Sequence, residues 1–150
     1  MRLIVITHRV RASRLIRSST MVIGFIIGGI FSDILFAAPL LRCQINRGAE
    51  SRLLEFSPVS DPYSVKAVDI SGGFRFKAVV VGGDSKIDYI KLYTYYESKR
   101  QAVLLHEAKY LAPVAQANPS SADLTGLNYV YSPRLERELL YSCALFEVTP

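Results

Sequence analysis

The feature that most constrains the fold of this chain is a glycine pair, Gly82-Gly83, placed between two segments with the alternation of β-strands. In the preceding segment, 74–81, every second residue is apolar, so those side chains would share one face of a strand. The following segment, 87–97, is rich in aromatic and β-branched residues and alternates in the same way. Glycine supplies the positive φ angles that tight turns need, and the pattern therefore predicts a β-hairpin.

Strand patterns continue along most of the chain after residue 38. The stretch 113–123 is small, polar and flanked by prolines, which predicts an exposed loop. The stretch 132–141 is ambiguous, because Ser132-Pro133 is typical of a helix start whereas the later residues alternate; a long strand is favoured. Strands are expected at 40–46, 53–56, 64–70, 74–81, 87–97, 102–111, 127–131 and 139–148. About six to eight short strands at this spacing are typical of a small antiparallel β-sandwich or barrel.

The N-terminal segment has the organisation of an export signal. Residues 1–38 carry five arginines, one aspartate and no lysine, whereas residues 39–150 are close to neutral. An uncharged apolar run, 21–31, follows the arginines, and two alanines end the segment. A basic region, an apolar region and a small-residue exit are typical of a secretory signal peptide. We predict a signal peptide or signal anchor at 1–38 and an exported β-domain, periplasmic or secreted, at 39–150.

Several forms of this export signal are compatible with the residues. Cleavage after Ala37 is favoured, because Pro39 would be an awkward first mature residue. If uncleaved, residues 21–38 are just long enough to span about 30 Å of hydrocarbon, and the positive-inside rule would place the domain outside the cytoplasm. Residues 40–43 have the outline of a lipidation box, although Arg42 stands where a small residue is expected. The Arg- and Ser-containing, acid-free opening of the chain also fits a mitochondrial presequence.

The chain has two cysteines, Cys43 and Cys143. An exported domain with two cysteines usually joins them in a disulfide, which here would close a loop of about 100 residues. Because the Cα atoms of a bridged pair lie within about 7 Å, the first and last strands are expected to be neighbours. The alternative is a pair of buried free thiols. A zinc site is not expected, since His106 is the one histidine that accompanies the cysteines in residues 39–150.

Residues 39–150 contain no recognisable catalytic motif. His106 and Glu107 are adjacent, so on a strand they would point to opposite faces, and a hydrogen-bonded structural role is expected for the histidine. Nucleophile-elbow and phosphate-loop patterns are missing. No cofactor or metal is predicted, and the near-neutral charge argues against nucleic acid. An enzyme is therefore disfavoured; the form it would take is a small hydrolase that uses His106.

A stripe of tyrosines gives the best indication of a binding role. On the strand expected at 87–97 one face would carry Tyr89, Lys91, Tyr93 and Tyr95. Left open to solvent, this face would offer rigid amphipathic rings to a protein or a glycan. If a second sheet covered it, the rings would be core residues, and this second interpretation is favoured.

The expected function follows from these observations by elimination. It is a non-enzymatic, exported binding or interaction module whose partner is a protein or glycan of the cell envelope. The alternative is a membrane-anchored structural or assembly protein of the envelope. Membrane contact is expected only through residues 21–38, if that segment is not cleaved.

Overall fold

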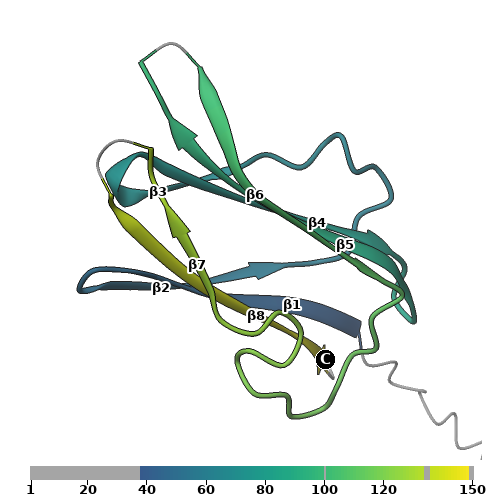
Figure 1. Ribbon diagram of the computed structural model, residues 1–150. Coiled ribbons are helices and arrows are strands. Elements are labelled where there is room, and N and C mark those ends of the chain that lie inside the picture. The colour runs from purple at the N-terminus through teal and green to yellow at the C-terminus, as the bar shows by residue number, and fades with distance from the viewer. Residues whose placement is uncertain (1–37, 100, 134–135, 149–150) are drawn as a thin grey trace, which may run out of the picture. The chain divides into compact units, whose positions relative to one another are not determined.

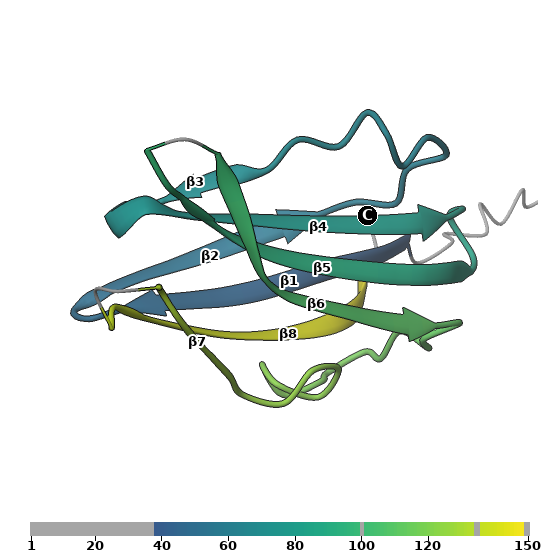
Figure 2. The same ribbon diagram turned by 45° about the horizontal axis from the view of Figure 1, so that its top comes forward.

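Eight strands make up the fold in the residues that the computed structural model describes, 38–99, 101–133 and 136–148. In chain order they are β1 (Ala38–Arg47), β2 (Glu50–Phe56), β3 (Val68–Ile70), β4 (Phe74–Gly82), β5 (Ile87–Glu97), β6 (Ala102–Leu111), β7 (Asn128–Tyr131) and β8 (Glu138–Val148). Two four-stranded antiparallel sheets, β2-β1-β8-β7 and β3-β4-β5-β6, lie face to face (Figures 1 and 2). The predicted small antiparallel sandwich is confirmed.

The predicted export segment lies outside this description. Residues 1–37, which include all but the last residue of the expected signal or anchor 1–38, are not among the described residues. In the part of the chain that is described, no helix is long and apolar enough to cross a membrane.

The core lies between the two sheets and is built from side chains that alternate along the strands. Phe76 of β4 contacts Tyr141 of β8 across the interface, with ring centres 5.1 Å apart. The largest wholly buried side chains are Tyr141, Phe74, Phe76, Leu41, Ile45, Ile90, Leu92 and Leu139. Burying one side chain of this size stabilises a fold by about 1.5–3 kcal/mol. Because side chains alternate along a strand, each of these strands turns one face toward the core.

A disulfide joins the first and last strands at the centre of one sheet. β1 and β8 pair antiparallel, with Cys43 directly opposite Cys143. The two cysteines form a disulfide with a Cα–Cα distance of 4.1 Å, and neither is exposed. The prediction that the first and last strands are neighbours is confirmed. A lipid on Cys43 is excluded in this bridged form, because its sulfur is already bonded.

The stretch 132–141 does not form one long strand, and that prediction is wrong. β7 ends at Tyr131 and β8 begins at Glu138, which lies directly opposite Tyr131. Between them the Ser132 N–H donates to the Arg137 carbonyl at 2.8 Å, and the Arg137 N–H donates to Ser132 Oγ at 3.1 Å. A serine side chain that bonds the backbone competes with a strand ladder, and Pro133 has no N–H for one. These residues therefore close a hairpin.

The segment between β2 and β3 is mostly a loop, so the strand expected at 64–70 is reduced to Val68–Ile70. Asp61 organises the preceding turn: its Oδ1 accepts the Tyr63 N–H at 2.9 Å, and its carbonyl accepts the Ser64 hydroxyl at 2.7 Å. The loop is also tied to β4, because the Val59 N–H donates to the Val80 carbonyl at 2.8 Å. It runs past β4 on its way to β3 (Figure 2). This places Tyr63 beside the outer face of the second sheet.

Candidate functional site

The predicted tyrosine stripe lies on the outer face of sheet β3-β4-β5-β6, away from the other sheet. On β5 the core side carries Ile90 and Leu92, both buried, and the opposite side carries half-buried residues. Those outer residues, called the tyrosine stripe below, are Tyr89, Lys91, Tyr93 and Tyr95. The favoured expectation that a second sheet covers these rings is wrong. A two-layer sandwich buries one face of each sheet, and the aliphatic side of β5 takes that place.

The side chains of the stripe contact one another and side chains of the neighbouring strand β6. The rings of Tyr93 and Tyr95 are stacked, with centres 6.0 Å apart and planes inclined by 16°. Lys91 Nζ lies 6.0 Å from the Tyr93 ring centre and 3.6 Å from a carboxylate oxygen of Glu107. On the neighbouring strand, Lys109 Nζ lies 5.3 Å from the Tyr89 ring centre. Distances of this size are those of aromatic stacking and cation–π contacts, so the rings are held before any ligand arrives.

The charges on this face are stable around neutral pH. A side-chain hydrogen bond with Tyr93 raises the pKa of Lys91, and the Glu107 carboxylate adds to the effect, so this lysine stays cationic. Burial raises the pKa of Tyr95, and the neighbouring Tyr93 and Glu107 raise it further, so its hydroxyl stays neutral. The stripe therefore combines the cation of Lys91 with the neutral hydroxyl of Tyr95.

A hollow opens where the loop before β3 meets the tyrosine stripe. Its volume is about 170 Å³, and it will be called the Tyr63 hollow. The residues that line it are Pro62, Tyr63, Lys77, Val79, Tyr89, Lys91 and Tyr93. Tyr63 is 93 % exposed, whereas Val79, which also lines the hollow, is 4 % exposed. The hollow thus has an apolar floor, aromatic walls and two lysines.

The sequence patterns did not single out Tyr63, which lies in a loop some 26 residues before the first tyrosine of the stripe. Nothing in local periodicity indicates that this loop returns to the sheet. A weak signal is available in the turn residues Pro58, Asp61 and Pro62, which indicate a rigid loop around the tyrosine. Its position over the sheet depends on the tie between Val59 and Val80, which is a tertiary contact.

His106 lies on the core side of β6 and is bonded to a tyrosine. Tyr141 Oη and His106 Nδ1 are 2.9 Å apart. Burial raises the pKa of Tyr141 far above its ordinary value, so its hydroxyl stays neutral and forms a hydrogen bond with the imidazole nitrogen. Among the described residues, no carboxylate or serine hydroxyl hydrogen-bonds to this histidine. The bond joins β8 of one sheet to β6 of the other.

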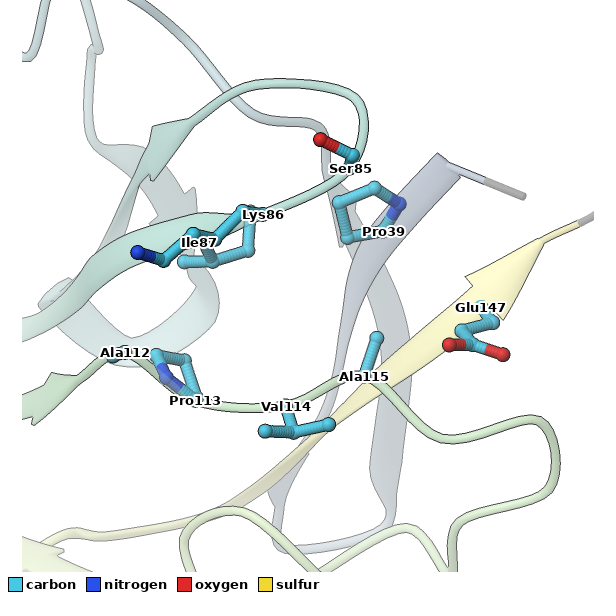
Figure 3. Close-up of a pocket in the computed structure, with 9 residues that line it drawn as sticks. All are labelled: Pro39, Ser85, Lys86, Ile87, Ala112, Pro113, Val114, Ala115 and Glu147. Atoms are coloured by element: carbon cyan, nitrogen blue, oxygen red, sulfur yellow. The ribbon is translucent and has the colours of Figure 1, made fainter. Parts of the chain in front are cut away.

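A second hollow of about 190 Å³ lies near the start of β1, between the β4–β5 turn and the segment after β6 (Figure 3). Its wall is largely aliphatic and proline side chains. Lys86 and Glu147, the ionisable groups that line it, lie on opposite sides in the close-up. They do not form an acid–base pair. In the described ranges no group of three or more His, Cys, Asp or Glu side chains is placed to hold a metal ion.

Comparison with known proteins finds no match, whether to a protein-family model, to a curated protein or to a solved structure.

Proposed function

We propose that this protein is an exported β-sandwich module that binds a protein or glycan of the cell envelope through the tyrosine stripe. The observation that carries the proposal is the outward position of the four stripe residues on β5. Tyrosine offers a large amphipathic contact at low conformational cost, because its side chain has two χ angles. Rings that are already stacked lose little further freedom when a partner binds, and this favours affinity.

The disulfide supports the exported setting of the proposal. Bridges of this kind form and persist in oxidising compartments and are rare in the cytosol. The arginine-rich, then apolar, composition of residues 1–38 supports export independently. Fractionation of a host that expresses the full chain tests this: we expect the domain outside the cytoplasm, with an intact mass two units lighter before reduction than after it. A reduced cytoplasmic product would contradict export.

The binding role is tested with a double variant, Tyr93→Ala/Tyr95→Ala. We expect it to lose at least about tenfold in affinity for the envelope fraction, because both stacked rings are removed. A matched control is Tyr129→Ala/Tyr131→Ala, which removes two exposed rings from β7 in the other sheet. Thermal unfolding of both variants should stay close to that of the wild type. Equal capture by the stripe variant and the wild type would exclude the stripe as the binding site.

The structural or assembly alternative makes a different prediction in the same fractionation. Retention of a full-length product in washed membranes would favour it, since residues 21–38 would then act as an anchor. A soluble product that begins near Ala38 would favour the binding module.

A further inference from the structure

The Tyr63 hollow combines aromatic walls with lysines, and we infer that it is the subsite for one acidic sugar unit of a glycan. The acidic group would be a carboxylate, phosphate or sulfate on the sugar ring. The inference rests on the proposed binding role and narrows it, because it selects an anionic glycan over a protein as the partner.

The walls of the hollow fit a sugar ring. Tyr63, Tyr89 and Tyr93 each contribute an aromatic side chain. The C–H bonds on one side of a pyranose pack against the negative face of an aromatic ring, and phenol hydroxyls can bond the sugar hydroxyls. The volume, about 170 Å³, is below the range of about 300–1,000 Å³ found for drug-sized ligands. It accommodates one monosaccharide unit, and the following units would lie along the open stripe.

The charges at the hollow call for an anion. Lys77 and Lys91 line it together, and Lys91 lies directly opposite Lys109 in the ladder between β5 and β6. Like charges directly opposite one another destabilise a sheet. Glu107 offsets Lys91, at 3.6 Å, but among the described residues no carboxylate lies within ion-pair distance of Lys77. A bound carboxylate, phosphate or sulfate would neutralise this excess positive charge.

The geometry favours a small charged group over an extended polyanion. The flanks of the same face carry the carboxylates of Asp69, Glu97 and Glu107, which pair with Arg75 and Lys91. A nucleic acid backbone that crossed the sheet would meet these carboxylates, whereas a single acidic sugar at the hollow would not. The loop that carries Tyr63 is already held by the hydrogen bonds of Asp61 and Val59, so binding a ligand requires little rearrangement.

Calorimetric titration of the disulfide-closed product of the full chain tests the inference. The probes are a galacturonic acid tetramer, a sulfated and a phosphorylated oligosaccharide of the same length, neutral cellotetraose and a short oligothymidylate. We expect at least one acidic saccharide to bind about tenfold or more tightly than cellotetraose, with affinity falling as salt is raised. Which acidic saccharide binds best identifies the anionic group. Equal binding of neutral and acidic sugars, no saccharide binding, or tighter binding of oligothymidylate would overturn the inference.

Two variants locate the subsite. Tyr63→Ala and Lys77→Gln should each weaken binding of the best acidic saccharide by about tenfold, since each removes one wall or one charge-assisted contact. Lys99→Gln, in the exposed turn after β5, is the matched control and should bind like the wild type. All three side chains are on the surface, so unfolding temperatures should stay close to the wild-type value. Unchanged binding by both hollow variants would overturn the assignment.

Failure of this inference is distinguishable from failure of the proposed function. If envelope capture is lost in Tyr93→Ala/Tyr95→Ala but is unaffected by Lys77→Gln and by added acidic saccharide, the stripe binds a protein and the sugar subsite is wrong. If the stripe variant captures as well as the wild type, the proposed function itself is wrong.

Discussion

At the scale of single residues, Tyr141 links the two sheets through its hydroxyl. Its ring is wholly buried, it packs on Phe76, and its Oη lies 2.9 Å from His106 Nδ1. A buried polar group is tolerated when it finds a partner, and the imidazole nitrogen is that partner. The pair therefore gives the half-buried His106 a structural hydrogen-bond partner.

Replacing this hydroxyl gives a pH-dependent prediction. Tyr141→Phe should lower the free energy of unfolding by about 1 kcal/mol at pH 7, because one net hydrogen bond is lost and Nδ1 of His106 is left unpaired. The pKa of Tyr141 is raised in the folded state, so the folded protein keeps a proton that the unfolded chain releases above about pH 10. The wild type therefore loses stability as the pH rises past that value, whereas the variant lacks this loss.

Urea unfolding at pH 7 and at pH 11 measures both effects. The wild type should be the more stable protein at pH 7, and its advantage should shrink or reverse at pH 11. An advantage that grows at alkaline pH would contradict the assignment of Tyr141 as a buried, neutral hydroxyl. The exposed Asp123 carboxylate accepts hydrogen bonds from Ser120, which lower its pKa. It is therefore ionised at both pH 7 and pH 11 and does not affect this comparison.

At the scale of elements, the β4–β5 hairpin depends on one of its two glycines. Gly82 has φ +157°, and a Cβ built there would lie 2.3 Å from the carbonyl oxygen of Lys86 and 2.7 Å from Cα of Ile87. Both neighbours are backbone atoms and cannot move without opening the turn. Gly83 has nothing within 4 Å of such a Cβ. A side chain at position 82 would therefore overlap the backbone, whereas one at position 83 would not.

Alanine substitutions distinguish the two positions. Gly82→Ala should destabilise the domain by about 1–3 kcal/mol or more, because it adds backbone strain and a steric overlap at the turn. Gly83→Ala is the control and should leave stability unchanged or raise it by up to about 1 kcal/mol, since it restricts the unfolded chain. Chemical denaturation of the two variants beside the wild type checks this. A similar loss at both positions would contradict the role given to Gly82.

The same strands show which features of the fold can be predicted from local sequence patterns and which cannot. Period-two alternation predicted β4, β5 and β6, and it predicted that Ile90 and Leu92 share one face of β5, because side-chain direction in a strand is a local property. The alternation is equally compatible with either face being covered, so it could not decide whether Tyr93 is core or surface. That depends on where the second sheet packs, which is set by contacts distant in the chain.

The irregular segments of the fold, among them the loop of the candidate site, could not be predicted from local patterns for a related reason. Ser132 closes a hairpin because its side chain bonds Arg137, five residues away, and strand alternation does not register such a bond. Tyr63 reaches the sheet because Val59 bonds Val80, 21 residues along the chain. The stripe on β5 was therefore predictable as a row of residues, and the hollow beside it was not.

At the scale of the whole molecule, the disulfide joins the beginning and the end of the sandwich. Cys43 and Cys143 are separated by 100 residues, and the strands that carry them lie at the centre of their sheet. For a loop of this length the chain-entropy model gives a stabilisation of about 4.7 kcal/mol, and measured values are often lower. Domains of this size have net stabilities of about 5–15 kcal/mol. We therefore expect the bridge to supply a large part of the stability of the domain.

Removing the bridge should have two measurable effects. Cys43→Ala/Cys143→Ala should lower the free energy of unfolding by about 2–5 kcal/mol, as judged from the urea midpoint and slope. In the wild type both sulfur atoms are inaccessible, so excess thiol should reduce the bridge slowly in buffer and faster as urea populates open states. Fast reduction without denaturant would mean that β1 and β8 separate readily. A loss of less than about 1 kcal/mol in the free energy of unfolding would mean that strand pairing alone holds the chain ends together.

Because the tyrosine stripe lies on the other sheet, reduction that leaves the fold intact should not change the affinity of the stripe for its partner.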